Sequence, residues 1–385
     1  MLLENHPYPQ DSRVRNEAQA LTESGYQVTL IAPRARGQRW CEDVARVRVC
    51  RFPAPQSAGA PLAYLWEYGC SMVGIFLWSL WVFARRGFDV VHAHNPPDTL
   101  VLIGLFYKIF GKRFVFDHHD LWPEMYFARF GKSNPLLHRA MTFFERLSCR
   151  WADHIIATNE SYKKMEMKRS QIPDDRITVV RNGPEPSRVR EVPPDPALRQ
   201  TGKFIIGYVG VIGFHDGLDY LLRALSHLRR DLERDGFLAL VIGRGDAVPS
   251  LKELAHELGL DQHVRFTGRV SDEDLMRYLS SADICVDPDP WNPFSDRSTM
   301  IKVAEYMALG KPVVAFDLRE HRVTAEGAAL YAKPNDEADF AAKIASLMDD
   351  PDRRLRMGLL GKTRVRTTLA WEHQAGRLLA AYGSL

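Results

Sequence analysis

Short apolar runs alternate with longer amphipathic segments along the whole of this 385-residue chain. Ten of these runs are of strand type, and they lie at 26–33, 88–95, 113–119, 153–159 and 177–183 and, further on, at 203–213, 238–246, 263–270, 282–290 and 311–317. Strands that alternate with helices indicate parallel sheets covered by helices. The pattern therefore predicts an α/β fold with two Rossmann-like, doubly wound domains.

A proline-rich segment separates the two series of strands. Residues 184–201 contain five prolines and show no apolar periodicity, which is typical of a linker. We therefore expect an N-terminal domain over 1–185, a linker over 186–201 and a C-terminal domain over 202–365. Only roughly three or four strand-type residues precede the first loop, fewer than usual, and we expect the natural chain to begin further upstream.

The overall charge and the cysteines exclude several classes of protein. The 51 lysines and arginines nearly balance the 48 aspartates and glutamates, so no overall field points to a nucleic-acid partner. The five cysteines are widely spaced and include no C-x-x-C pair, which favours scattered reduced thiols over disulfides or zinc. Since we find no export signal, the sequence predicts a cytoplasmic protein.

Two segments of the first half suggest a membrane surface. The apolar run at 69–84 is shorter than the roughly 20 residues that a spanning helix needs, which favours a buried helix or one that lies on a membrane. Residues 125–151 mix aromatic side chains with basic ones, among them Arg139, Arg146 and Arg150. This mixture of side chains fits docking on anionic lipid, and it fits equally well an ordinary helix with a solvated basic face.

The stretch 292–305, NPFSDRSTMIKVAE, predicts an anion site at the head of a helix. Pro293 discourages helix before it, and Ser298 or Thr299 can cap the first turn. Backbone N–H groups near Met300 would then face the preceding loop and attract phosphate. Lys302 shares a helix face with Glu305, and an ordinary surface pair is the alternative for these two.

Two glycine turns follow strands in the second half. Gly210 and Gly213 let the backbone approach a ligand closely, although the chain has neither a dinucleotide fingerprint nor a P-loop. Arg244 follows the next strand and offers a charge for a diphosphate, or is simply a solvated arginine.

Polar residues also follow two strands of the first half. They include His94 and Asp98 after one strand, and His119 and Asp120 after the next. Ligands gather at the carboxyl ends of parallel strands, so we expect a site there. We find no metal-ligand spacing, and we interpret the D-P-D-P segment at 287–290 as a rigid strand exit rather than a metal motif.

Taken together, these segments resemble the retaining glycosyltransferase family 4, of GT-B fold, over nearly the whole chain. The telling matches are 13–33, 177–183, 263–286 and 302–317. A bacterial subgroup of the cell-surface polysaccharide type has H-N-P-P-D, D-x-H-D-x-x-P-E and N-P-x-x-D-x-S-T segments, matched here at 94–98, 117–124 and 292–299. The resemblance also implies that a closing helix over 366–385 crosses back to the first domain.

The resemblance implies sugar transfer with retention of configuration, without a metal or other cofactor. The donor would be a nucleoside diphosphate sugar, UDP- or GDP-linked, and the acceptor a saccharide or lipid-linked saccharide. Glu305 matches the glutamate that holds the ribose, whereas Arg297 stands where the family has its sugar-binding glutamate. Two usual cations are replaced by Val211 and Asp216, so we expect other groups to bind the diphosphate: Arg244, Arg297, Lys302 and the N–H groups of Thr299 and Met300.

On the first domain, His119 matches the family histidine near the reacting sugar, and we assign Asp120 a supporting role. Asp11, Arg13, His94 and Asp98 are expected as acceptor contacts. The expected location is the cytoplasm, including the inner face of the plasma membrane as a peripheral protein. Two alternatives are a nucleotide-sugar epimerase and a GT-B partner subunit with altered catalysis, the latter because of Arg297, Val211 and Asp216.

Overall fold

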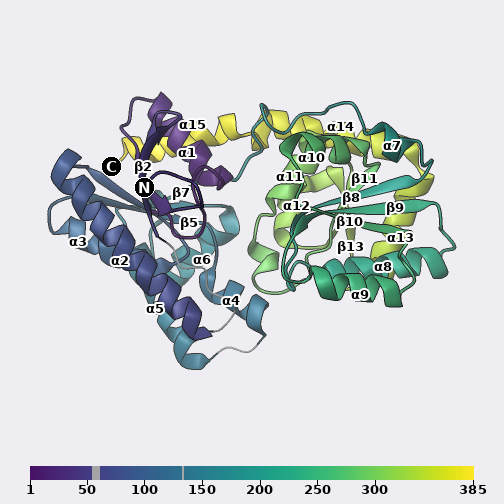
Figure 1. Ribbon diagram of the computed structural model, residues 1–385, viewed down its shortest axis with the longest axis horizontal. Helices are drawn as coiled ribbons and strands as arrows, with labels where there is room; N and C mark the ends of the chain where they lie inside the picture. Colours follow the sequence, from purple (N-terminus) through teal and green to yellow (C-terminus); the bar gives the residue numbers. More distant parts are fainter. Residues whose placement is uncertain (54–60, 132–133) are drawn as a thin grey trace. The chain divides into compact units, whose positions relative to one another are not determined.

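The computed structural model describes residues 1–385 except 54–60 and 132–133 (Figure 1). It divides into two compact units. Unit 1 contains Met1–Arg181 and His373–Leu385, and unit 2 contains Asn182–Glu372. Each unit is an α/β structure built on a mainly parallel sheet, which confirms the predicted fold class.

Unit 1 contains two groups of strands that Leu2 joins. One group has the order β1-β3-β2 and the other the order β4-β5-β6-β7. Leu2 forms parallel bridges to Ile31 and to Ala93, one in each group. The strands are β1 (Thr29–Pro33), β2 (Cys41–Val44), β3 (Val47–Phe52), β4 (Val90–His94), β5 (Arg113–His118), β6 (His154–Ala157) and β7 (Ile177–Val179).

The helices of unit 1 connect these strands, and the C-terminal helix joins them (Figure 1). They are α1 (Ser12–Glu23), α2 (Pro61–Arg86), α3 (Val101–Lys108), α4 (Trp122–Phe130), α5 (Pro135–Trp151), α6 (Glu160–Ser170) and α15 (Trp371–Gly383). Asp11 caps α1 because its Oδ1 accepts a hydrogen bond from the N–H of Val14 at 3.0 Å. Helix α2 is longer than the predicted run, and by length and composition its segment Tyr68–Arg86 could cross a membrane.

Unit 2 has a single six-stranded sheet in the order β10-β9-β8-β11-β12-β13, with every pair parallel. The strands are β8 (Phe204–Val211), β9 (Phe237–Arg244), β10 (Val264–Gly268), β11 (Ile284–Asp287), β12 (Val313–Phe316) and β13 (Ala329–Ala332). The helices are α7 (Pro196–Arg199), α8 (Leu218–Arg230), α9 (Val248–Glu257), α10 (Asp272–Ser281), α11 (Ile301–Ala308), α12 (Arg319–Ala325), α13 (Glu337–Asp349) and α14 (Pro351–Arg364).

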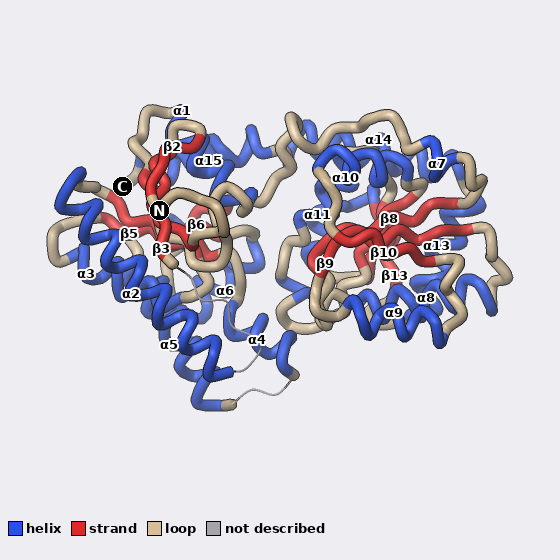
Figure 2. The backbone as a smooth tube through the Cα atoms, in the orientation of Figure 1, coloured by secondary structure: helices blue, strands red, loops and turns tan. Residues whose placement is uncertain are grey.

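Helices cover both faces of the unit 2 sheet (Figure 2). One apolar core combines the sheet with α8, α9 and α13, and the other combines it with α10 and α11. Apolar side chains on alternate strand positions reach one core or the other, as a doubly covered sheet requires. All ten predicted strands are confirmed, whereas β2, β3 and β13 were not predicted.

The proline-rich segment belongs to unit 2. The N–H of Val192 donates to Ser280 Oγ at 3.2 Å, and the N–H of Asp195 donates to Ser281 Oγ at 2.8 Å. These bonds attach the segment to the end of α10. The boundary between the units therefore falls at Arg181 and Asn182, a few residues before the linker that composition predicted.

Two of the cysteines are not scattered. Cys41 in β2 is the register partner of Cys50 in β3, and their Sγ atoms lie 3.1 Å apart. All five cysteines are free thiols, as predicted, but this pair is adjacent rather than scattered, because the hairpin that brings the two together was not predicted.

Candidate functional site

Asp117 is the centre of a buried polar cluster at the carboxyl ends of β4 and β5. Arg13 donates from Nη2 to Oδ1 at 2.7 Å and from Nε to Oδ2 at 3.2 Å. His94 Nδ1 lies 3.1 Å from Asp117 Oδ2, and His119 Nε2 lies 3.0 Å from the same oxygen. His119 is the member that reaches the surface, with 13% of its side chain exposed, whereas Arg13, His94 and Asp117 are buried.

The charges in this cluster balance. Burial opposes ionisation of Asp117, but Arg13 and His119 outweigh it and hold the pKa of Asp117 well below its ordinary value. Burial raises the pKa of Glu17 well above its ordinary value, and burial lowers that of His94. These shifts favour the ion pair of Arg13 and Asp117 and disfavour charge on Glu17 and on His94.

Asn95 orders the loop that carries His119. Its Oδ1 accepts hydrogen bonds from the N–H groups of His119 at 2.5 Å and Asp120 at 3.2 Å. Its Nδ2 donates to Asp98 Oδ1 at 2.9 Å and to the carbonyl of Asp120 at 2.8 Å. The sequence prediction missed Asn95, although it lies in the H-N-P-P-D segment between two residues that were chosen.

The structure thus brings four predicted residues into one network around His119, but not as surface contacts. Arg13, His94 and Asp98 are 4%, 0% and 0% exposed, so they support the loop from inside rather than offer atoms to an acceptor. Burial also raises the pKa of Asp98 to about 7. Asp11 is partly exposed and caps α1. The expectation of direct acceptor contacts from the three buried residues therefore does not fit their burial.

A second buried ionic group follows on the next residue of β5. His118 Nδ1 lies 2.8 Å from Glu166 Oε1 of α6. Burial disfavours the charged imidazole, but the hydrogen bond and charge of Glu166 outweigh it and raise the pKa of His118 to about 9. Nearby, Arg169 pairs with Glu145 at 2.8 Å and with Glu124. Glu124 therefore has a structural partner in α6.

In unit 2, the ends of β8 and β9 approach each other closely at Gly210 and Gly243. Gly243 has φ +143°, and a Cβ there would lie 1.9 Å from the carbonyl oxygen of Gly210. In the following loop, Asp216 Oδ2 accepts a hydrogen bond from the N–H of Gly213 at 2.6 Å. Asp216 therefore shapes this loop. Arg244 is the register partner of Val211 and is exposed beside it.

The head of α11 differs from the prediction. The N-cap is Met300, and within the described part of the chain the helix has no side-chain cap. Ser298 Oγ donates to the carbonyl of Phe294 at 2.9 Å, and Thr299 Oγ1 donates to Glu320 Oε2 at 3.4 Å. The predicted capping by Ser298 or Thr299 is therefore wrong. The N-cap Met300 makes no side-chain hydrogen bond to the first turn, where the helix presents N–H groups and the positive end of its dipole.

Lys302 is paired with two aspartates. Its Nζ lies 3.0 Å from Asp287 Oδ1 and 3.2 Å from Asp289 Oδ2, and 13% of its side chain is exposed. His321 Nε2 lies 3.1 Å from Asp287 Oδ2. Burial opposes ionisation of Asp287, but Lys302 and His321 outweigh it and lower its pKa. The D-P-D-P segment therefore binds a cation that the protein itself supplies.

Arg297 precedes α11, and Glu305 lies within it. Glu305 is partly exposed, and burial raises its pKa. Lys302 points to Asp287 and Asp289 instead of forming the surface pair with Glu305 that we considered. Arg297 Nη1 donates to the carbonyl of Pro293 at 2.6 Å and remains partly exposed.

Among the residues that the structure describes, two groups of side chains are close enough to hold a metal ion. One consists of Glu17, His92, His94 and Asp117, and the other of Asp287, Asp289 and His321. Each already contains a protein cation in contact with its aspartate, Arg13 in the first and Lys302 in the second. A metal ion at either place would have to share the carboxylate with that cation.

Comparison with known proteins matches both halves of the chain. A family model described as glycosyl transferase 4-like domain matches residues 10–183, and one described as glycosyl transferases group 1 matches residues 190–364. An uncharacterized glycosyltransferase of Methanocaldococcus jannaschii is 25% identical over 263 residues. That match covers 63% of each protein, so the chain spans about three fifths of the length of this curated relative.

Solved structures share the fold over the full chain. Sucrose-phosphate synthase of Thermosynechococcus elongatus is 20% identical with a TM-score of 0.81, covering 100% of this chain and 98% of that one. Anabaena HepE, in complex with UDP and glucose, is 16% identical with a TM-score of 0.75 and covers 100% and 99%. Given both family models and this shared two-unit fold, the chain belongs to the GT-B glycosyltransferases of the family 4 type.

Proposed function

We propose that this protein transfers a sugar from a nucleoside diphosphate sugar to an acceptor hydroxyl, with retention of configuration and without a metal or other cofactor. The observation that carries the proposal is the head of α11, which has no side-chain cap among the described residues. The N–H groups of the first turn and the helix dipole favour a phosphate at that point. The UDP complex of HepE supports the same class of donor.

Unit 2 binds the donor in this proposal. The glycine turn at Gly210 and Gly213 lets the backbone approach the nucleotide, and Glu305 accepts hydrogen bonds from the ribose. Arg244 and Arg297 are exposed or partly exposed and bind the diphosphate together with the head of α11. Charge-assisted hydrogen bonds of this kind stabilise the leaving diphosphate as its charge develops.

In this proposal Lys302 affects the diphosphate indirectly, through two aspartates. Its contacts with Asp287 and Asp289 neutralise a buried acidic pair directly behind the head of α11. This arrangement prevents two carboxylates from repelling the donor. We therefore assign Lys302 a positioning role, in place of the direct contact with the diphosphate that the sequence predicts.

Unit 1 provides His119 in the proposed reaction. Asp117 fixes its imidazole through Nε2, and Arg13 fixes Asp117 in turn. His119, with 13% of its side chain exposed, is assigned the role of positioning the sugar. Asn95 and Asp98 hold the main chain of His119 and Asp120, so the loop is set before the donor arrives.

A panel of UDP- and GDP-linked sugars tests the proposal. We expect one donor to be consumed with release of the nucleoside diphosphate, and His119→Ala to lower turnover by about 10²-fold or more while donor affinity stays unchanged. Arg244→Gln should instead weaken donor binding. Absence of binding to every nucleotide would support a partner subunit, and a changed sugar without acceptor would support an epimerase.

We further propose a lipid-linked saccharide as acceptor and peripheral attachment to the inner face of the plasma membrane. Helix α3 packs on α2 through Ser79 and Tyr107, whose oxygens lie 2.8 Å apart, and it also contacts α5. These three helices expose large apolar side chains: Trp66, Val73, Leu77 and Trp81 on α2, Leu102 on α3, and Leu136 and Phe143 on α5. Exposed apolar side chains of this kind fit the lipid interface.

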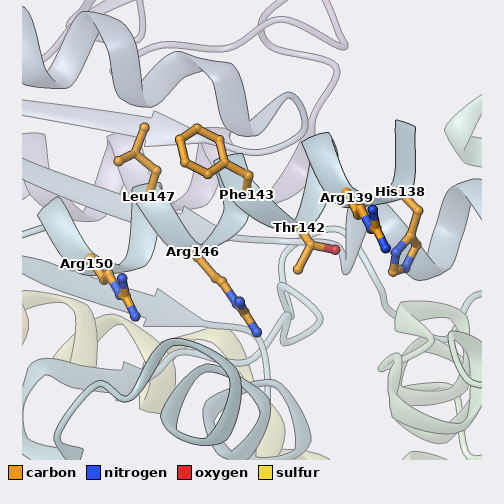
Figure 3. Close-up of a pocket in the computed structure, with 7 residues that line it drawn as sticks. All are labelled: His138, Arg139, Thr142, Phe143, Arg146, Leu147 and Arg150. Carbon is orange, nitrogen blue, oxygen red and sulfur yellow. The ribbon is translucent and has the colours of Figure 1, made fainter. Parts of the chain in front are cut away.

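Helix α5 adds the positive charge. Arg139, Arg146 and Arg150 follow helical spacing, are all exposed, and extend to the same side of the helix (Figure 3). Together with His138 and Thr142 they line a groove of about 340 Å³. Anionic headgroups supply the matching charge, at about 1 kcal/mol for each arginine near the surface. Because Ile75, Ser79 and Val82 of α2 are buried in unit 1, we propose that α2 lies on the membrane rather than spans it.

A further inference from the structure

Cys41 and Cys50 face each other across the hairpin formed by β2 and β3. They are partners in the antiparallel register, and their Sγ atoms lie 3.1 Å apart. Next to them, the N–H of Arg51 donates to the carbonyl of Trp40 at 2.7 Å, which makes Trp40 and Arg51 a hydrogen-bonded pair. Because the two kinds of pair alternate along an antiparallel ladder, Cys41 and Cys50 form a non-hydrogen-bonded pair.

A non-hydrogen-bonded pair suits a covalent link. Its Cα atoms are about 4.5 Å apart and its side chains are the closer of the two kinds. Protein disulfides have Cα separations of about 4.4–6.8 Å, so this position on the hairpin lies within their range. The backbone of β2 and β3 can therefore accept a bond between the two sulfurs without a change of register.

We propose that Cys41 and Cys50 form a reversible disulfide when the protein meets a low-molecular-weight disulfide, so that the hairpin is a modification site. Of the three remaining cysteines, Cys149 and Cys285 are buried in different units. Cys70 is partly exposed on α2 and serves as an internal comparison.

The exposure of the two sulfurs sets the order of the steps. Cys41 is partly exposed, whereas Cys50 is 0% exposed. The thiolate of Cys41 attacks one sulfur of the oxidant, which leaves a mixed disulfide on Cys41 and releases one thiolate. The thiolate of Cys50 then attacks the Cys41 sulfur, which closes the protein disulfide and releases the second thiolate. The two protons of the cysteines pass to the two released thiolates, and two electrons reduce the oxidant.

The surroundings of Cys50 make the second step dependent on pH. Burial, followed by the hydrogen bond with Cys41, raises the pKa of Cys50 to about 12, although Arg48 and Arg86 lower it in part. Since the thiolate is the nucleophile, closure should become about tenfold faster for each unit that the pH rises, as long as the pH stays below that pKa.

Closure would hold an edge strand on the sheet. Strand β2 pairs with β3 and is the last strand of its group. The Glu42 carboxylate, 2.7 Å from Arg51, is a noncovalent link at the same place. A covalent bond beside it limits the opening of the hairpin, because cross-links restrict the open states more than the closed one.

Peptide mapping of the full chain after exposure to glutathione disulfide tests this inference. With free thiols blocked in acid and no reductant added, we expect one peptide pair joined through Cys41 and Cys50. Thiol titration in denaturant should fall from the five cysteines of the sequence to three, because two are consumed. A reductant such as dithiothreitol should restore all five.

Three variants give the expected intermediates. Cys50→Ser should stop at a glutathione adduct on Cys41, and Cys41→Ser should leave Cys50 unmodified. Cys70→Ser should oxidise like the natural sequence. The inference fails if the wild-type protein keeps both hairpin thiols, or ends at a glutathione adduct on Cys41 without closure. Since the mapping of the wild-type chain decides the matter, poor folding of a variant does not leave the question open.

Discussion

Arg13 meets both carboxylate oxygens of Asp117, at 2.7 and 3.2 Å, with both side chains buried inside unit 1. The pair stands directly behind His119, the member of the cluster that reaches the surface. The stability of unit 1 and the orientation of a proposed reaction residue therefore depend on the same two charges.

Removal of Arg13 alone should lower the free energy of unfolding more than removal of Arg13 and Asp117 together. Arg13→Met leaves the Asp117 charge buried and unpaired, so we expect a loss of about 3–5 kcal/mol in the free energy of unfolding. The double variant Arg13→Met/Asp117→Leu should recover a large part of that loss. Urea denaturation measures both, and equal losses in single and double variants would contradict a coupled pair.

Variants of Lys302 can separate an effect on stability from an effect on donor binding. Lys302→Met leaves Asp287 and Asp289 without their ammonium group, so we expect destabilisation by about 3 kcal/mol or more. Adding Asp289→Asn should restore part of it and also most of the affinity for a nucleoside diphosphate, measured by calorimetry. If affinity stayed low in that double variant, Lys302 would bind the diphosphate directly.

The pair of His118 and Glu166 predicts a pH dependence of stability. The pKa of His118 rises from an ordinary 6.5 to about 9 in the folded protein, so its contribution is complete below pH 6.5 and is lost as the pH rises through 9. The loss amounts to about 3 kcal/mol at most. Urea denaturation from pH 6 to 10 should show this decline in the wild-type chain and a flatter profile in His118→Gln.

Vesicle flotation tests the membrane surface. Replacement of Arg139, Arg146 and Arg150 by Gln should reduce binding to anionic vesicles by about 100-fold, at about 1 kcal/mol for each charge. A matched control replaces three exposed arginines of unit 2 by Gln: Arg265, Arg269 and Arg356. Equal loss in both triple variants would show that net charge, rather than the α5 surface, determines binding.

Two glycines near strand ends of unit 2 offer a matched comparison. Gly243→Ala would place a Cβ 1.9 Å from the carbonyl of Gly210, so we expect a loss of several kcal/mol in stability, as for a strained and overpacked site, and a weaker nucleotide affinity. Gly268 has φ +71° with nothing within 4 Å of its Cβ position. Gly268→Ala should therefore cost only about 1–2 kcal/mol and leave the affinity unchanged.

The strands were predictable because their apolar runs are long and bounded by polar loops. The β2–β3 hairpin was not, since its turn uses Ala45 and Arg46 at φ 49° and 67° instead of the glycine or asparagine that signals such turns. The strand ends also indicated where polar groups gather. That Arg13 is buried could not be predicted, because an arginine in an amphipathic helix usually faces water and its partner lies 104 residues away.

Lys302 shows the same limit in unit 2. Its spacing from Glu305 suggested a pair on one helix face, but the structure gives it to Asp287 and Asp289 of another element. Local spacing predicts neighbours within a helix. The partners of Lys302 are instead carboxylates at the end of a strand, and only the tertiary fold brings them close to it.

Asp117 and His118 occupy consecutive positions of β5, so they point to opposite faces of the sheet. Asp117 meets Arg13 on one face, and His118 meets Glu166 on the other. A slip of β5 by one residue would exchange the two faces, setting an imidazolium against a guanidinium and a carboxylate against a carboxylate. Like charges would then meet on both sides at once, so misaligned pairing of this strand is penalised electrostatically before any apolar contact is lost.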